Sequence, residues 1–573
     1  MDGRCGLGKR KMSDGSLKKR TWFFLFLLVW CMQMLTAVYF CCQKQGFHED
    51  EFYTYYSTAR TNGLLIEDGA WMERDAYFNE FVVLEGQGFQ YGLVKMVQSW
   101  DVHPPVYYWV FHTVCSFFPG QFSKWFGLGI NLAAFGLSLF LLYALSVKVT
   151  GGSEKRSLLV CLFYGFTPAA MSGVVFIRMY ALLTVFVYLC AILHVDAVNK
   201  REKKSAPGTG RPDKLSFGTF LLPLMIVTYL GFLTQYYYFI FLFFMAFAFC
   251  VYLLWRDRNL WNCIRYGASL AAAFISAYLT YPSCLGQMFR GQRGAQAAGN
   301  FFDLSNTMPR IAFFWELMDE YVFGKMLFPL LLLLLLLILT AYGIRKRKHY
   351  AGVREGKEEE KWPGLFADIR EGWKNNVVWW MLFVAVTGYF LAVSKTALLL
   401  GNTSIRYQLP VYGMAVLLLF EAVWGIGKGF LTGRKTVLYA VSAALGLFIS
   451  LSGLFAGRVV FLYPEAAGRF AFAREKAEQG VPVICLYDAG QNWCVWDCAD
   501  EFFAYDRIYF VSQSDTEPIA DAVIADSGEL VVYLYNTAEK EAQLQRILDS
   551  NPKLSGYELQ YREKYCDVYY FYE

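Results

Sequence analysis

The stretch "HEDEFYTYYSTAR" at residues 48–60 comes soon after the apolar run "WFFLFLLVWCMQMLTAVYFCC" at residues 22–42. An apolar run of about twenty residues is long enough to cross a bilayer as a helix. Three carboxylates, Glu49, Asp50 and Glu51, therefore lie where the chain has just left a membrane. Negative charge is also favoured at helix starts. By itself the stretch fits either a functional acid or the solvated start of a surface helix.

The composition predicts a polytopic membrane protein. The 573 residues are 56% hydrophobic, whereas soluble domains are typically about 45–50% apolar. The apolar residues come in blocks that predict a mainly α membrane domain of about 11–13 transmembrane helices within residues 21–456. The basic residues 1–20 predict a cytoplasmic tail before an uncleaved first helix. The net charge of +5 is small and lies mostly in short loops, which argues against nucleic-acid binding.

The positive charges predict the sidedness of the loops. Three loops rich in Lys and Arg should be cytoplasmic: 199–214, 345–361 and 427–435. Alternation then places the loops 43–103 and 282–323, and the region 457–573, outside, provided that the short apolar stretch 104–119 makes no full crossing. We therefore expect a multi-pass protein of the cell membrane with its active site on the extracytoplasmic face.

Residues 457–573 predict a small extracytoplasmic α/β domain. "VPVICLYD", "RIYFVS", "ELVVYLYN" and "DVYYFYE" have strand character, and "AEKEAQLQRILDS" has helical apolar spacing. Four cysteines could form disulfides in an oxidising exterior: Cys485, Cys494, Cys498 and Cys566. The aromatic and acidic segment 488–503, with Trp493, Trp496 and Asp497, fits a sugar-stacking surface, but such a mix is more commonly a partly buried turn.

A second acidic stretch, "SWDVHPPVYYWVFHTV" at residues 99–114, ends the first outer loop. Asp101 and His103 precede a Pro-Pro pair, which can begin a helix but cannot lie inside one. An acidic pair after the first membrane helix, followed by a loop that ends in D-x-H-P-P-x-Y-Y, resembles polyprenyl-phosphate-dependent glycosyltransferases of the C-type membrane fold. The likeness is greatest to protein O-mannosyltransferases and aminoarabinose-type transferases of glycosyltransferase family 39. Those families place a catalytic aspartate in the first outer loop and an H-P-P or K-P-P element at its end.

Three further segments support the resemblance, which covers most of residues 20–456. "FIRMYALLTVFVYL" at 176–189 is similar to the family's arginine-then-tyrosine helix start, and "SIRYQLPVYGMAVLLL" at 404–419 to its late R-Y-x-x-P helix start. "FLTQYYYFIFLFF" at 232–244 is similar to an aromatic outer turn. The chain departs from the pattern at Gln235, where the family commonly has His, and its terminal α/β domain matches no family we recognise.

The resemblance implies transfer of a sugar from a polyprenyl-phosphate donor to an extracytoplasmic acceptor, with inversion. A carboxylate must take the proton of the attacking hydroxyl, and cations must hold the leaving phosphate. The family's motif puts the catalytic base at Asp50, with Glu51 as second choice. The candidate substrate-binding residues are Asp101, His103, Arg178, Tyr180, Arg290, Arg293, Lys395, Arg406 and Tyr407. Arg178 also fits an arginine that reaches to the membrane interface, and exposed loop arginines such as Arg290 and Arg293 are common.

Several alternatives stay open at the sequence level. His48, Asp50, Glu51, Asp101 and His103 could together bind a divalent metal ion. The expected partners are the lipid-linked donor, membrane lipid and an acceptor. The acceptor is a protein, a glycolipid or a cell-wall polymer, and the sequence does not choose among the three. A lipid transporter or flippase is the second hypothesis, although the charges lie in outer loops and no inverted repeat of broken helices is evident. A non-catalytic membrane scaffold that presents the α/β domain is the third.

The sidedness can be tested by thiol labelling. In a cysteine-free variant, single cysteines at positions 62 and 292 should react with an impermeant thiol reagent added from outside, and one at position 204 should not. All three thiols should react after the membrane is opened with detergent. Labelling from outside at position 204 alone would show that the topology is the reverse of the predicted one. The argument that the acids and arginines share the outer face would then fail.

Overall fold

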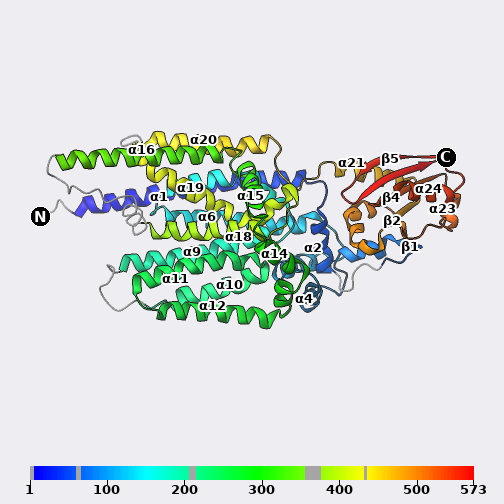
Figure 1. Cartoon of the computed structure of the whole chain (residues 1–573), viewed down its shortest axis with the longest axis horizontal. Coiled ribbons are helices and arrows are strands. Elements are labelled where there is room, and N and C mark those ends of the chain that lie inside the picture. The colour runs from blue at the N-terminus through cyan, green and yellow to red at the C-terminus, as the bar shows by residue number, and fades with distance from the viewer. Residues whose placement is uncertain (1–4, 60–65, 205–213, 355–375, 431–434) are drawn as a thin grey trace.

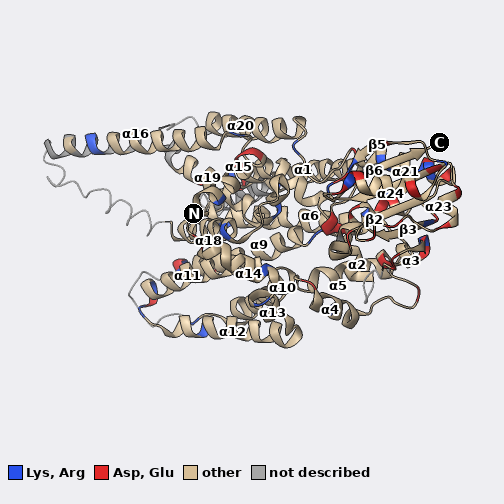
Figure 2. Ribbon diagram, turned by 45° about the vertical axis from the view of Figure 1, so that its right-hand side comes forward, with Lys and Arg blue, Asp and Glu red and all other residues tan. Residues whose placement is uncertain are grey.

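The computed structural model describes residues 5–59, 66–204, 214–354, 376–430 and 435–573. The molecule is elongated: a bundle of roughly parallel helices carries a sheet domain at one end (Figure 1). Its charged residues crowd into the sheet domain and the helix ends, while the middle of the bundle is almost free of them (Figure 2). The predicted fold class, a mainly α membrane domain with a small α/β domain at its C-terminal end, is confirmed. Parts of the three predicted cytoplasmic loops lie outside the described residues.

Among the described residues, eight helical stretches are long and apolar enough to cross a membrane. They belong to α1 (Cys5–Gln43), α6 (Lys124–Val149), α9 (Tyr180–Lys204), η2 with α10 (Phe217–Leu221 and Leu222–Thr234), α11 (Tyr237–Asp257), α16 (Leu327–Arg354), α18 (Val377–Thr396) and α20 (Lys435–Phe455). Three bent helix pairs raise the number to as many as eleven: α7 (Glu154–Tyr164) with α8 (Pro168–Val175), α12 (Trp261–Thr280) with α13 (Ser283–Phe289), and η3 (Gly401–Tyr407) with α19 (Leu409–Phe430). The stretch 104–119 forms only the 11-residue α5 (Val106–Ser116), which is too short to span.

Proline positions explain two of the three bends. Pro168 opens α8 behind Thr167, whose hydroxyl accepts the Ala170 N–H and so caps the helix. Pro282 directly precedes α13, which turns by 103° from α12. Proline lacks an N–H and fits only the first turn of a helix. A further short non-helical segment, between the end of α8 and the start of α9, supplies Arg178 to the site described below.

Glycines allow the helices of the bundle to approach closely. A Cβ on Gly413 would lie 2.2 Å from the Tyr188 hydroxyl, and one on Gly388 would lie 2.3 Å from the ring of Phe244. Such distances are shorter than any real contact, so each glycine is required by a bulky aromatic on the facing helix. Small residues at helix crossings are typical of packing inside membranes, where dispersion contacts replace the hydrophobic effect.

The C-terminal sheet has six strands in the order β1-β3-β2-β4-β6-β5. Its strands are β1 (Ala70–Glu73), β2 (Val483–Tyr487), β3 (Arg507–Ser512), β4 (Glu529–Tyr535), β5 (Gly556–Arg562) and β6 (Cys566–Tyr572). The central strands β3, β2 and β4 are parallel, and the others are antiparallel to their neighbours. The surrounding helices are α21 (Ala466–Glu478), η4 (Ala489–Cys498), α22 (Ala499–Phe502), α23 (Ala522–Asp526) and α24 (Lys540–Ser550). All four predicted strands and the predicted helix are present, whereas β1, β5 and α21 were not expected.

Strand β1 belongs to the first outer loop, more than 400 residues from its partner β3. Trp71 holds it in place: the indole N–H donates to Asp521 Oδ2 at 2.9 Å, and the ring packs against Tyr509 and under the Arg507 guanidinium. The remaining outer segments are helical: α2 (Glu49–Ala59), α3 (Arg74–Phe78), η1 (Asn79–Phe81), α4 (Tyr91–Trp100), α14 (Gln292–Phe302) and α15 (Thr307–Tyr321). Residues 70–73, which precede α3, are therefore part of the terminal sheet.

No disulfide is present among the cysteines that the structure describes. Cys498 faces Cys566, with 3.2 Å between the sulfur atoms, and both thiols are buried. Cys494 is partly exposed and Cys485 is buried in strand β2. Of the four cysteines that could form disulfides, Cys498 and Cys566 are the two whose sulfur atoms lie in contact, so this pair would need little movement to form a disulfide.

Replacing Trp71 by Ala tests whether β1 depends on this side chain. The variant loses the bond to Asp521 and two ring contacts of a half-buried indole, so it should destabilise the terminal domain by roughly 1–3 kcal/mol. Limited proteolysis followed by mass spectrometry should show faster cleavage of the first outer loop. Trp100→Ala, at a tryptophan that is 66% exposed, is the matched control and should digest like the parent protein. Equal digestion rates for all three proteins would mean that β1 is held by its backbone alone.

Candidate functional site

The site is built around the first turn of α2, where a buried ion pair fixes the backbone. Glu51 and Lys44 are both fully buried, with 2.9 Å between Nζ and Oε2. Glu51 also accepts the backbone N–H groups of His48 and Ile177, each at 2.6 Å. Lys44 donates in addition to the carbonyl of Phe461, at 2.8 Å. Donors aimed at both oxygens favour the ionised carboxylate, so Glu51 fastens α2 to the end of α1, to the start of α9 and to the chain that leaves the last membrane helix.

Asp50, one residue earlier, has an accessible side chain that is 28% exposed. Its Oδ2 accepts a hydrogen bond from Arg406 at 2.6 Å. The surrounding protein opposes ionisation of Asp50, but the guanidinium groups of Arg406 and Arg178 outweigh this effect and hold the pKa of Asp50 well below its ordinary value. Asp50 is therefore a carboxylate at neutral pH.

His48 lies on the other side of Asp50. Its Nδ1 accepts the Asp50 backbone N–H at 3.0 Å and is 3.6 Å from Asp50 Oδ2. Burial lowers the pKa of His48 to about 3, so the ring is neutral and the contact with Asp50 is not an ion pair. A neutral ring that accepts the N–H at Nδ1 carries its proton on Nε2.

Two buried arginines flank Asp50. Arg178, between α8 and α9, donates to the backbone carbonyl of Asp50 at 2.9 Å and to the Thr54 hydroxyl at 3.1 Å. Arg406, at the end of η3, donates to Asp50 and to the Tyr407 hydroxyl. Its Nε is buried without a hydrogen-bond partner among the described residues. A buried donor without a partner is costly, and it is available to an incoming oxygen atom.

Asp101 and His103 approach from the end of the first outer loop, just before α5. Burial raises the pKa of Asp101, and Arg178 opposes only part of this effect. Burial and the positive charge of Arg178 lower the pKa of His103 well below its ordinary value. Both residues thus lie within electrostatic reach of Arg178 and Asp50.

Aromatic rings surround the charged centre. Tyr180 and Tyr407 meet edge to face, with 5.8 Å between ring centres, and Tyr407 meets Tyr237 in the same way. Tyr180 stacks on Phe176, which also lies 5.1 Å from the Arg406 guanidinium. These rings restrict water and so strengthen the electrostatic interactions among the charged groups.

Three of the predicted cations lie elsewhere. The Lys395 ammonium donates to the carbonyl of Asp303 and to the side chains of Asn306 and Thr307, at 2.6–2.9 Å, and thereby holds the start of α15. Arg290 and Arg293 are exposed; Arg290 directly follows α13, and Arg293 lies in the first turn of α14. Arg293 is near enough to affect the charge at Asp101 and His103. The structure thus brings Asp50, Asp101, His103, Arg178, Tyr180, Arg406 and Tyr407 together and gives Lys395 other partners.

Thr54 and Lys44 belong to the site but were not predicted as site residues. Thr54 lies one helical turn after Asp50, and helical spacing does place the two on one face of α2. No comparable pattern marks Lys44, whose partners Glu51 and Phe461 lie 7 and 417 positions away.

The five residues that could have bound a metal ion are not arranged for it. Within the described residues, no group of three or more His, Cys, Asp or Glu side chains is disposed to hold a metal. Both oxygens of Glu51 are occupied by donors, and His48 Nδ1 accepts a backbone N–H. Glu51 and the Nδ1 atom of His48 are thus already engaged within the protein.

Comparisons with known proteins give distant neighbours. No protein-family model and no curated sequence match the chain. ArnT from Cupriavidus metallidurans, solved with undecaprenyl phosphate, is similar over 96% of this chain and 98% of its own, with 11% identity and a TM-score of 0.47. The oligosaccharyltransferase of Archaeoglobus fulgidus is similar over 93% of this chain and 69% of its own, with 11% identity and a TM-score of 0.44. Both are membrane glycosyltransferases of the class that the sequence motifs resemble, but at these TM-scores the likeness assigns no activity to this chain.

Glu51→Gln tests the structural role of the buried pair. The amide cannot neutralise Lys44, and breaking one partner of a buried ion pair costs about 3–5 kcal/mol. We expect a large loss of monodisperse protein in detergent, measured by fluorescence-detected size exclusion. The exposed Glu316→Gln is the control. The double variant Lys44→Met with Glu51→Leu leaves no unpaired charge and should recover part of the yield. Wild-type yield for Glu51→Gln alone would show that the pair does not hold α2.

Proposed function

We propose that the chain is an integral membrane glycosyltransferase that moves a sugar from a polyprenyl-phosphate-linked donor to an acceptor on the extracytoplasmic face, with inversion. The observation that carries this proposal is the contact of Asp50 with Arg406 at 2.6 Å, beside Arg178. It combines a carboxylate with two buried guanidinium groups. These are the groups needed to deprotonate a hydroxyl and to hold a leaving phosphate.

The position of the site favours a lipid-linked donor. The three residues lie at or between the ends of helices: Asp50 at the start of α2, Arg178 between α8 and α9, and Arg406 at the junction of η3 and α19. A polyprenyl chain would lie along the apolar helices, with its phosphate at the level of the arginines. Planar guanidinium groups bind phosphate oxygens bidentately, and the unpartnered Nε of Arg406 offers a further donor.

Phosphate binding would also activate the base. While Asp50 is paired with Arg406, its lowered pKa makes it a weak base. A phosphate that takes over the Arg406 guanidinium removes the strongest stabilisation of the Asp50 charge, and the pKa of Asp50 then rises toward its ordinary value. Donor binding and base activation are thereby coupled, so an acceptor hydroxyl is deprotonated only when a donor is present.

The reaction is a single displacement. The acceptor oxygen attacks the anomeric carbon while its proton passes to the Asp50 carboxylate. The bond between the anomeric carbon and the phosphate oxygen breaks, and the polyprenyl phosphate leaves as an anion held by Arg178 and Arg406. One displacement inverts the configuration at the anomeric carbon. The buried tyrosines limit access of water, which would otherwise compete with the acceptor.

The two alternative functions predict different behaviour. A transporter or flippase needs ionisable groups along a path through the membrane, whereas Asp50 belongs to α2, which lies at the end of the bundle next to the sheet domain (Figure 1). A scaffold needs no carboxylate beside the arginines. Mass analysis of glycans and of lipid-linked sugars, with and without the chain, would identify the donor and the acceptor.

Asp50→Asn tests the catalytic assignment. The amide keeps the shape but cannot accept a proton, so turnover should fall by roughly 10²-fold or more, the low end of general-base contributions. Binding of polyprenyl phosphate should persist, because the arginines hold the phosphate. Sugar transfer in proteoliposomes, with the donor found by the mass analysis, measures turnover. Asp75→Asn, at an exposed aspartate of α3, is the control. Full activity of Asp50→Asn would show that Asp50 is not the base. Loss of activity in a folded Glu51→Gln variant, with Asp50→Asn still active, would assign the base to Glu51.

A further inference from the structure

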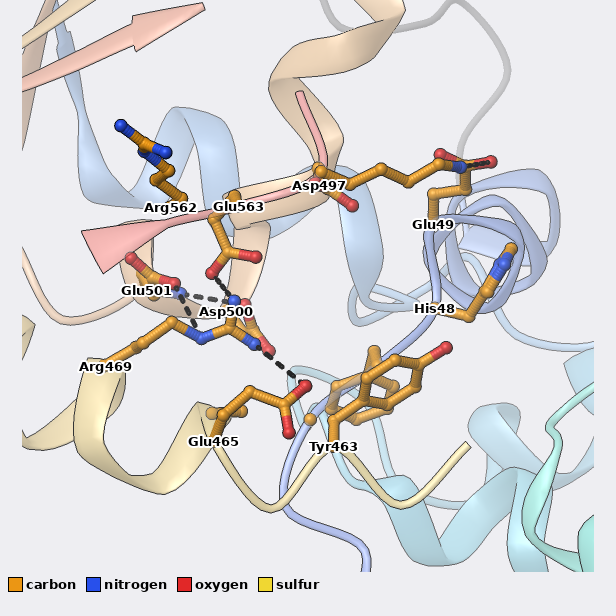
Figure 3. Close-up of a pocket in the computed structure, with 14 residues that line it drawn as sticks. His48, Glu49, Tyr463, Glu465, Arg469, Asp497, Asp500, Glu501, Arg562 and Glu563 are labelled. Atoms are coloured by element: carbon orange, nitrogen blue, oxygen red, sulfur yellow. Dashed lines mark hydrogen bonds and ion pairs between the residues drawn. The ribbon is translucent and has the colours of Figure 1, made fainter. Parts of the chain in front are cut away.

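A cavity of about 240 Å³ lies where α2 meets the terminal domain. Three segments form its wall: residues 46–49 before and at the start of α2, residues 463–469 leading into α21, and the sheet domain at 497–501 and 562–564 (Figure 3). Ligand pockets are typically about 300–1,000 Å³. The cavity lies just below this range, so its occupant is a small group, of the size of a single ring, and not a longer polymer.

The wall of the cavity carries more acids than bases. Its carboxylates are Glu49, Glu465, Asp497, Asp500, Glu501 and Glu563, and its cations are Arg469, Arg562 and Lys564. Arg469 is shared by Glu563, by Glu465 at 3.9 Å and by Glu501 at 4.0 Å. Arg469 therefore cannot neutralise all three carboxylates, and the acids of the wall outnumber its cations by six to three.

Two carboxyl groups of the wall have no cation of their own. Asp497 Oδ2 is buried without a hydrogen-bond partner among the described residues. Asp500 accepts the backbone N–H of Glu501 at 3.1 Å. Burial and the charge of Glu49 raise the pKa of Asp497 to about 7, and burial and Glu501 raise that of Asp500. Lys564 and Arg469 oppose the shift at Asp497, and Arg469 opposes the shift at Asp500, but neither carboxyl forms an ion pair among the described residues.

His48 connects the cavity to the catalytic carboxylate. It lines the cavity, and its Nδ1 is 3.6 Å from Asp50 Oδ2. The neighbouring Glu49 also lines the cavity, where it accepts a hydrogen bond from Lys564 at 2.9 Å. A molecule in the cavity is therefore separated from Asp50 by the width of one imidazole ring.

We propose that this cavity binds the acceptor and that the group it holds is a sugar ring bearing a free, protonated amine. The inference rests on the proposed function, whose acceptor it specifies. The ammonium group lies against Asp497 and Asp500 and donates to the buried Oδ2 of Asp497, which has no partner among the described residues. A hydroxyl of the same acceptor extends past His48 toward Asp50, which receives its proton during transfer.

The rest of the wall suits a sugar better than a simple alkylammonium ion. Arg469, Arg562 and Lys564 supply donors and the carboxylates supply acceptors, and a polyhydroxylated ring uses both kinds. Tyr463 offers a ring face on one side of the cavity (Figure 3). Tyr463 has a φ of 50°, a left-handed conformation that is unusual for a bulky residue and is commonly associated with binding sites. That conformation brings the phenol into the wall.

Binding of three related sugars to the full-length protein in nanodiscs, without donor, tests the proposal. Glucosamine at a pH at which its amine is protonated, N-acetylglucosamine and glucose differ mainly at one substituent. Saturation-transfer NMR competition should give at least tenfold tighter binding for glucosamine than for the other two. Asp497→Asn should reduce this preference about tenfold. Asp526→Asn, at an aspartate that is 83% exposed and paired with Lys553 at 2.5 Å outside the cavity, should leave it unchanged.

Lys564→Gln gives an independent test if Asp497→Asn does not fold. It removes a cation from the wall and frees Glu49, so glucosamine should bind more tightly, while glucose should not. Equal binding of the three sugars would overturn the proposal, and so would tight binding of lysine amide in place of glucosamine. Since no donor is present, these results do not depend on catalysis. Glucosamine binding without sugar transfer by the parent protein would overturn the proposed function and leave the amine site standing.

Discussion

The buried ion pair of Lys44 and Glu51 fixes the geometry on which the site depends. Lys44 follows the first membrane helix, and Glu51 lies in the first turn of α2. Through Ile177 and Phe461 the pair also reaches the start of α9 and the segment that leaves the last membrane helix. Burying two charges is expensive, and the cost is offset only when all their hydrogen-bonding groups are engaged. Here both charges have several hydrogen-bond partners, so the first turn of α2 is held in one position.

Neighbouring acids on this turn have separate roles because of helix geometry. Successive residues point about 100° apart around a helix. Glu51 therefore points into the protein and Asp50 toward the arginines, while Glu49 faces the terminal domain. A shift of α2 by one residue would bury Asp50 and expose Glu51. The rigidity given by the pair is thus a condition for placing a reactive carboxylate beside two guanidinium groups, where small displacements are costly to catalysis.

Much of the fold and part of the site could be predicted from local sequence. The apolar blocks predicted the membrane helices because about twenty successive apolar residues are enough to identify a span. The strands within residues 483–572 were likewise predicted from short local patterns. Asp50, Arg178 and Arg406 were predicted from the order of short motifs along the chain. The β1 segment "AWME" is too short to carry a pattern, and its pairing with β3 depends on residues far away. The role of Glu51 and the charge of the cavity likewise arise from contacts between distant segments, which no local pattern records.

Strand β1 has a consequence for the order in which the protein is made. Residues 70–73 leave the ribosome long before residues 507–512, to which they are hydrogen-bonded in the finished sheet. Most of the membrane helices are synthesised in between, and the edge of β3 stays open until the two segments meet on the same side of the membrane. Contacts of such large sequence separation form slowly. The segment that carries β1 therefore completes its structure last, and a chain that stops short of the terminal domain leaves β1 without its partner strand.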